Sequence, residues 1–134
     1  MGLILDTSVL IEAERTRGSI SDLVLRLART EEIAIAAVTL MEVSDGVARA
    51  RDEATRVRRS EFVKGVREGL RVIPLNDEIA VSAGLLNGRL RRRGVTVGLA
   101  DAMIAATAMS VGYGVLTLNG RHFEAFEGLR VVGF

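Results

Sequence analysis

Three acidic residues, far apart in the sequence, each stand where an apolar run meets the start of a predicted helix. Asp6 and Glu42 follow apolar runs at 3–5 and 33–38, and Asp101 opens an alanine-rich segment. In an open sheet of parallel strands, the carboxyl ends of the strands meet at one edge, where ligands and catalytic groups gather. We therefore expect these three carboxylates to lie at the same edge.

Carboxylates brought together can do metal-dependent chemistry. Without a counter-charge they repel one another, so at least one has a raised pKa until a cation neutralises the set. Hard oxygen ligands without cysteine favour Mg²⁺ or Mn²⁺ over zinc or copper. Such an ion activates water as a nucleophile and stabilises charge on a phosphodiester. The pattern therefore indicates phosphodiester hydrolysis.

Each acid also has a purely structural explanation. Asp6 is a favourable N-cap for the helix that follows it. Thr39 and Glu42 match the S/T-x-x-E capping box for a helix over 40–50, and Asp101 is a first-turn acid that the helix dipole favours. Three separate caps need not converge, whereas the ligands of one ion must. The shared location therefore favours the metal site.

Composition limits the other chemistries. The 134 residues predict a single domain, 1–134, with one core and one active site. With no cysteine, disulfides and thiolate metal sites are excluded, and with His122 as the only histidine, two-histidine zinc motifs are excluded too. No apolar run approaches the roughly 18 residues of a membrane span, and no signal peptide is visible. We expect a soluble, cytoplasmic protein without membrane contact.

The net charge of +1 conceals arginine clusters at 56–59 and 89–93. Phosphate contact is one explanation, and a solvated helix face is the other. Charge alone does not establish a nucleic-acid partner.

Short apolar runs alternate with longer amphipathic segments, which predicts βαβ units, an α/β fold and a mainly parallel five-stranded sheet. Ser19 and Asn76 are expected to cap helices. The predicted strands lie near 2–5, 33–37, 70–74, 114–118 and 129–132, and the predicted helices span 9–15, 22–29, 40–50, 52–68, 77–93 and 100–111.

Four stretches together resemble the PIN-domain ribonucleases, and more closely the VapC-type toxins of toxin-antitoxin pairs. The resemblance runs nearly end to end and is most specific in the third stretch. The stretches are LDTSVLI at 5–11, MEV at 41–43, GLADAMIAATA at 98–108 and LTLNGRHF at 116–123.

This resemblance implies a three-layer α/β/α sandwich in which Asp6, Glu42 and Asp101 hold one or two Mg²⁺ ions, with Mn²⁺ as a substitute. It also implies that Thr7 or Ser8, together with Thr117, orders water or backbone near them. The implied activity is cleavage of RNA, typically a tRNA or rRNA, to leave a 5'-phosphate and a 3'-hydroxyl. The implied partners are a VapB-like antitoxin, whose tail fills the active-site groove, and a second copy of the chain in a homodimer.

One position departs from the family. Many relatives carry aspartate at a fourth acidic position, where this chain has Asn119. Asparagine offers a neutral carbonyl or a hydrogen bond but no charge, so a second metal ion is in doubt. Asn119 followed by Gly120 is also a common turn sequence. His122, three residues later, either contacts phosphate or is solvated.

Two other functions stay open. A catalytically weak or inactive PIN-like module that binds RNA or protein is the main alternative, and Asn119 is the feature that favours it. A phosphoryl-transfer domain with Asp6 as covalent nucleophile is less favoured, because Ser8 replaces the second aspartate expected there and no strand-end lysine is present.

Overall fold

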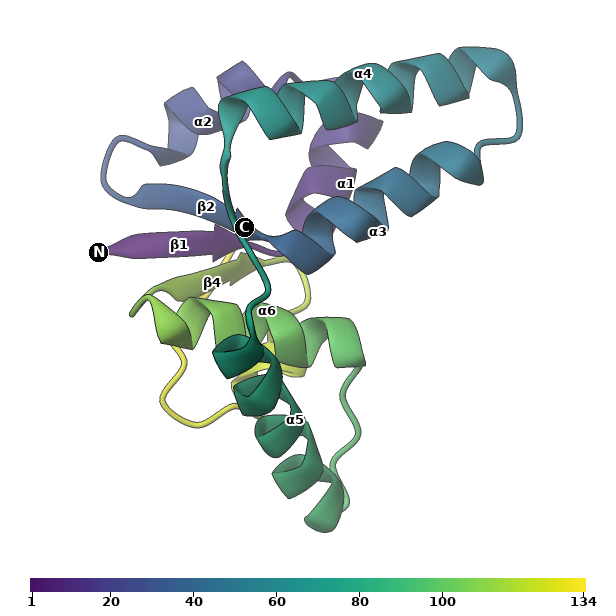
Figure 1. The fold of residues 1–134 in the computed structure, drawn as a ribbon. Helices are drawn as coiled ribbons and strands as arrows, with labels where there is room; N and C mark the ends of the chain where they lie inside the picture. Colours follow the sequence, from purple (N-terminus) through teal and green to yellow (C-terminus); the bar gives the residue numbers. More distant parts are fainter.

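A single five-stranded sheet forms the centre of the computed structural model, which describes all residues from 1 to 134 (Figure 1). The strand order is β3-β2-β1-β4-β5, and every pair is parallel. The expected α/β fold is therefore confirmed, with a sheet that is entirely rather than mainly parallel. The strands are β1 (Gly2–Leu5), β2 (Glu32–Ala36), β3 (Arg71–Ile73), β4 (Gly114–Thr117) and β5 (Val131–Gly133).

Helices cover both faces of the sheet, which gives the three layers that the family resemblance implied (Figure 1). Helices α1, α2 and α4 pack on one face and α5, α6 and α7 on the other, while α3 extends from the carboxyl edge and contributes side chains to both cores. The helices are α1 (Thr7–Arg15), α2 (Ile20–Leu27), α3 (Ala37–Ala48), α4 (Glu53–Gly69), α5 (Asp77–Arg92), α6 (Leu99–Ser110) and α7 (Gly120–Glu124).

Strand β1 shows why the sequence makes two cores. Its side chains alternate between the faces, so Leu3 and Leu5 join the α1–α2–α4 core while Ile4 joins the α5–α6–α7 core. All three are buried because β1 lies in the middle of the sheet. A strand buried on both faces is continuously apolar, as 3–5 is.

Helix α6 is rich in alanine because it lies close against the sheet. Ala102, Ala105, Ala106 and Ala108 are all buried, and small side chains let the helix backbone approach the strands. This close packing fixes the helix whose first turn carries Asp101.

The chain direction creates a switch point next to β1. From β1 the chain builds outward through β2 and β3, then crosses to β4 and β5 on the other side. Ligands of open parallel sheets bind in the crevice at such a point, outside the carboxyl ends of the strands. Asp6 lies there, and its backbone N–H donates to the carbonyl oxygen of Leu116 in β4 over 2.9 Å.

Two of the expected caps are present, but the helix starts expected at 9, 22 and 40 each lie two or three residues too late. Ser19 and Asn76 each accept a hydrogen bond from the backbone of the helix that they precede. The predicted start of a helix at 40, with Thr39 as its cap, is wrong because α3 already begins at Ala37. The capping-box explanation of Glu42 therefore does not hold.

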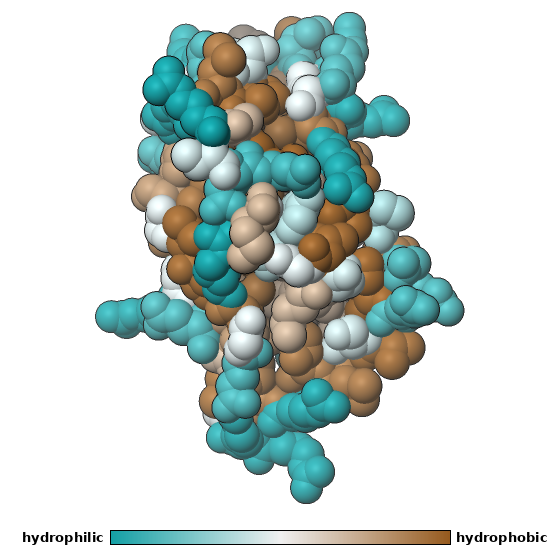
Figure 2. Space-filling view, turned by 90° about the vertical axis from the view of Figure 1, so that its left-hand side faces the viewer, coloured by the Kyte–Doolittle hydropathy of each residue, from teal (hydrophilic) through white to brown (hydrophobic).

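The opposite edge of the sheet, where the strands begin, faces the viewer in Figure 2. Charged and apolar side chains alternate over this face without one continuous apolar patch (Figure 2). Among the helices of the chain, none combines the length and the apolar character needed to cross a membrane.

Candidate active site

Asp6 is held by two hydroxyl groups at the switch point. Its Oδ2 accepts a hydrogen bond from Ser8 Oγ at 2.6 Å and another from Thr117 Oγ1 at 2.8 Å. Each hydroxyl is itself fixed by a backbone N–H, of Leu118 on Ser8 and of Asn119 on Thr117. Although Asp6 occupies the N-cap position of α1, its side chain makes no cap hydrogen bond. The capping explanation of this carboxylate is therefore not supported.

Glu42 is tied to the start of α1. Thr7 Oγ1 donates to Glu42 Oε1 over 2.6 Å, and the hydroxyls of Thr7 and Thr39 lie 3.0 Å apart. Thr39, expected as a helix cap, is fully buried and lies inside α3. Thr7, which directly follows Asp6, therefore links Glu42 to the start of α1, and Thr39 lies beside the Thr7 hydroxyl.

Asp101 stands in the first turn of α6, as expected, and its closest polar partner comes from α7. Nδ1 of His122 lies 3.1 Å from Asp101 Oδ2. The His122 side chain is 59% exposed and that of Asp101 is 21% exposed, so the contact lies at the rim of the site. His122 is thus neither simply solvated nor free.

The three carboxylates influence one another, and we call Asp6, Glu42 and Asp101 together the carboxylate edge. Burial raises the pKa of Glu42 above its usual value, against the hydrogen bond from Thr7, and the negative charges of Asp6 and Asp101 raise it further. Burial and the charge of Asp6 likewise raise the pKa of Asp101, while His122 opposes the shift. Burial is thus the main cause of both raised pKa values, and the neighbouring negative charges add to it.

The donor set of the carboxylate edge suits a hard divalent cation. In each of the three acids one oxygen has a polar neighbour and the other, Oδ1 of Asp6, Oε2 of Glu42 and Oδ1 of Asp101, has no hydrogen-bond partner. As the side chains lie, however, no three His, Cys, Asp or Glu residues stand close enough to enclose an ion. A closed metal site formed by all three acids therefore stays a prediction. The three acids do lie at the same edge of the sheet, near enough for their charges to interact.

Asn119 lies beside the carboxylate edge but contributes only its backbone. It precedes α7 as the N-cap residue, makes no side-chain cap, and donates its N–H to Thr117 Oγ1 over 2.9 Å. Its exposed side chain has no hydrogen-bond partner. A direct catalytic role of this amide is still a prediction.

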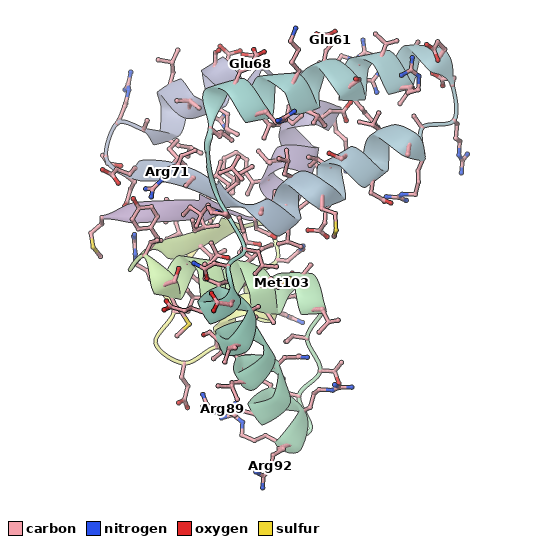
Figure 3. All side chains as sticks on the ribbon, viewed as in Figure 1. Glu61, Glu68, Arg71, Arg89, Arg92 and Met103 are labelled. Carbon is pink, nitrogen blue, oxygen red and sulfur yellow. The ribbon has the colours of Figure 1, made fainter.

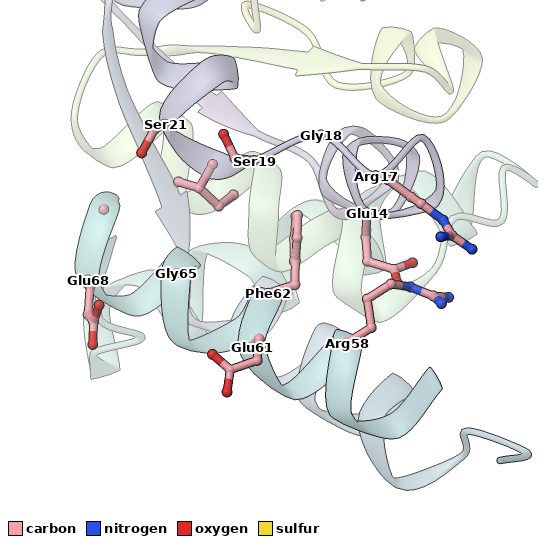
Figure 4. Close-up of a pocket in the computed structure, with 12 residues that line it drawn as sticks. Glu14, Arg17, Gly18, Ser19, Ser21, Arg58, Glu61, Phe62, Gly65 and Glu68 are labelled. Atoms are coloured by element: carbon pink, nitrogen blue, oxygen red, sulfur yellow. The ribbon is translucent and has the colours of Figure 1, made fainter. Parts of the chain in front are cut away.

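Two grooves lie near α4, and only one reaches the carboxylate edge. The groove in Figure 4 runs between the α1–α2 turn and α4, has a volume of about 490 Å³, and is lined by Glu14, Arg58 and Glu61 among others. A smaller groove of about 190 Å³ lies between α1, α3 and α4 and includes Glu42 in its wall. The second groove is the one that connects apolar surface to the site.

Two contacts of the site cannot be predicted from the sequence. One joins His122 to Asp101, and the other joins Thr39 to Thr7. Neither has a local sequence signal, because each joins two segments that meet only in the folded chain. The expected supporting residues Thr7, Ser8 and Thr117 all contact an acid of the carboxylate edge.

Comparison with known proteins relates nearly the whole chain to one family. The family model of the PIN domain matches residues 3–129. The Ribonuclease VapC1 of Rickettsia felis is 33% identical over 133 residues, covering 98% of this chain and 96% of that protein. The tRNA(fMet)-specific endonuclease VapC of Salmonella typhimurium is 34% identical over 102 residues, covering 76% of this chain and 75% of that protein.

Solved structures agree with these sequence matches. A chain in the crystal structure of DNA-bound VapBC from Salmonella typhimurium superposes with a TM-score of 0.84 and 28% identity, covering 99% of this chain and 98% of that one. A chain of VapBC2 from Rickettsia felis, bound to a promoter DNA fragment, has a TM-score of 0.86 at 21% identity, which shows a common fold.

Proposed function

The chain belongs to the PIN-domain family, and from this premise we propose that it is an endoribonuclease that needs a divalent metal ion and acts as the toxin of a toxin-antitoxin pair. The observation that carries the proposal is the carboxylate edge, where three acids from separate segments lie near enough at the switch point of a parallel sheet for their charges to interact. The names of the curated relatives, which are ribonucleases, support the class of reaction.

The oxygens without partners on Asp6, Glu42 and Asp101 would hold Mg²⁺, or Mn²⁺ as a substitute, because both ions prefer carboxylate oxygens. When bound, the ion supplies a positive charge that activates water and stabilises the negative charge developing on the phosphodiester. The hydroxyls of Ser8 and Thr117 bond one oxygen of Asp6, and that of Thr7 bonds one oxygen of Glu42, which leaves the other oxygen of each acid for an ion. The neutral Asn119 adds no charge, which favours one ion over two.

The RNA substrate would reach the carboxylate edge between the α3–α4 and α5–α6 pairs. Phosphates need positive charge to approach three acids, and the free end of α5 carries exposed arginines at 89, 91, 92 and 93. Arg89 and Arg92 point away from the body of the protein (Figure 3). Only Arg93 of this group is near a carboxylate, at 3.9 Å from Glu127. A tRNA or rRNA in the cytoplasm is the proposed substrate, supported by the relative named for tRNA(fMet).

A VapB-like antitoxin is the proposed protein partner. The related structures are complexes of VapC with VapB, and the groove beside Glu42 offers an apolar floor next to the carboxylate edge. The tail of an antitoxin lying in that groove would block the site. A second copy of the chain is proposed to pair through exposed apolar side chains such as Val81 and Leu85, one turn apart on α5.

Cleavage assays with purified protein test the function. We expect cutting of tRNA or rRNA with Mg²⁺ or Mn²⁺, no cutting in EDTA, and a loss of about a hundredfold or more in Asp101→Asn, the scale of removing a charge-stabilising group. Asp77→Asn is the matched control, because Asp77 is an exposed first-turn acid of α5 whose charge is not among those that shift the pKa of Glu42 or Asp101. Undiminished cutting by both Asp6→Asn and Asp101→Asn contradicts the proposal.

A non-cleaving binding module is the second candidate, and Asn119 is the observation that favours it. In that case the protein binds RNA or a protein partner, shows no cutting with either ion, and shows no Mn²⁺ binding that depends on the carboxylate edge.

A further inference from the structure

His122 lies against one of the three acids in a way that the proposed reaction does not require. Its Nδ1 is 3.1 Å from Asp101 Oδ2, the distance of an ion pair between a protonated imidazole and a carboxylate. An ionised carboxylate only accepts hydrogen bonds, so this contact stabilises Asp101 when Nδ1 carries hydrogen.

The position of His122 is set by its neighbour in the core. Phe123 is fully buried and packs with Phe126 at a ring distance of 6.4 Å. The backbone N–H of His122 donates to the carbonyl oxygen of Asn119 over 3.1 Å and closes the first turn of α7. The buried Phe123 and the turn hydrogen bond therefore fix the backbone of His122 at the rim of the site, although most of its imidazole is exposed.

Asp101, like Glu42, has a single polar neighbour, and that neighbour is far more exposed than Thr7. Asp6 has two hydroxyl donors, and Glu42 has a donor in Thr7, which is itself buried. Asp101 has no partner other than His122. His122 is thus the polar neighbour of Asp101, as hydroxyl groups are the polar neighbours of Asp6 and Glu42.

We propose that His122 is a positioning residue, which holds Oδ2 of Asp101 so that Oδ1 stays turned toward the ion-binding side of the carboxylate edge. This inference rests on the proposed function, since it concerns how the acid is prepared for a divalent cation. A side chain that fixes a metal-binding group typically contributes tenfold to a hundredfold to metal affinity. His122 itself is not a ligand in this arrangement, because the nitrogen nearest the site faces a carboxylate.

Mn²⁺ binding, measured by electron paramagnetic resonance at one pH, tests the inference without RNA cleavage. His122→Ala is expected to weaken Mn²⁺ binding about tenfold. His122→Asn is expected to bind within about threefold of the wild type, because the amide nitrogen of asparagine occupies nearly the place of Nδ1 and donates likewise. Arg121→Ala is the matched control from the same turn, an exposed residue that contacts no acid.

The outcomes separate this inference from the function on which it rests. If the wild type binds Mn²⁺ and His122→Ala binds as tightly or more tightly, the positioning role is wrong and the proposed function stands. Equal weakening in His122→Ala and His122→Asn also overturns the role. If the wild type binds no Mn²⁺, the metal-dependent function fails first and the inference falls with it. Circular dichroism of each variant confirms that the fold is retained.

Discussion

Thr117 Oγ1 donates to Asp6 Oδ2 over 2.8 Å, so two residues 111 positions apart are joined where the neighbouring strands β1 and β4 end. Thr117 is almost completely buried, and its hydroxyl also accepts the N–H of Asn119. One side chain therefore both orients a proposed ligand and satisfies the backbone where β4 leads into α7.

Replacing Thr117 by valine keeps the volume but removes the hydroxyl. We expect the free energy of unfolding to fall by about 1–3 kcal/mol, because the N–H of Asn119 loses its acceptor and Asp6 loses a donor. Thermal unfolding measures this, and RNA cleavage should fall with it. Thr107→Val is the matched control, since the hydroxyl of that buried threonine bonds only the carbonyl of Met103 in its own helix. Equal effects of the two substitutions would contradict a special role for Thr117.

The location of the site can be predicted from the sequence, but its contacts cannot. The alternation of apolar runs and helices predicts parallel strands, and parallel strands place Asp6 at a crevice whatever the details of packing. Glu42 lies in the helix that follows β2 and Asp101 at the start of the helix that precedes β4, so both are expected at the same edge. The PIN-domain resemblance is confirmed by the match over residues 3–129.

The boundary between β2 and α3 shows what the sequence lacks. Residues 33–38 are continuously apolar, with no glycine, proline or polar cap to mark the change, so the pattern predicts a helix that begins after Thr39 rather than at Ala37. Helix α7 escapes prediction, because five residues are too few to show a helical period. The contact of His122 with Asp101 depends on where α7 meets α6, which only tertiary packing decides.

The amide of Asn87 provides a prediction about stability alone. Asn87 lies on the buried face of α5, and its Oδ1 is fully buried without a hydrogen-bond partner. Substitution by leucine, which has a similar size, removes an unsatisfied polar group, so we expect unfolding to cost about 1 kcal/mol more. Asn76→Leu is the opposite control, because Asn76 caps α5 and its loss destabilises. A lower melting temperature for Asn87→Leu would indicate an unrecognised partner for this amide.

The arginines at the end of α5 are expected to contact RNA phosphates. Arg91→Ala with Arg92→Ala should weaken RNA binding and reduce the slope of log affinity against log salt by about one for each phosphate that these arginines neutralise. Arg67→Ala is the control, an exposed arginine in the last turn of α4. Filter binding over a salt series measures both quantities. An unchanged slope would mean that these arginines contact solvent and not RNA phosphates.

The raised pKa values of Glu42 and Asp101 predict how stability depends on pH when no cation is bound. A carboxyl whose pKa is higher in the folded protein than in the unfolded chain binds more protons when folded, so its stabilising contribution is present at low pH and disappears as the pH rises through the folded pKa. Asp101→Asn removes one such group and weakens the repulsion on Glu42. Its melting temperature should therefore exceed that of the wild type at pH 7, and the difference should shrink toward pH 4.

The expected difference at pH 7 is a few degrees at most, because both groups are only partly buried and solvent screens them. Acids with a lowered pKa, such as Asp52 and Glu53, have the opposite pH dependence, but they are present in both proteins and cancel in the comparison. Added Mg²⁺ should stabilise the wild type more than Asp101→Asn, since only the wild type keeps all three acids of the proposed site. If Asp101→Asn instead melts several degrees lower at pH 7, the carboxylate stabilises the first turn of α6, and repulsion at the carboxylate edge is too weak to matter.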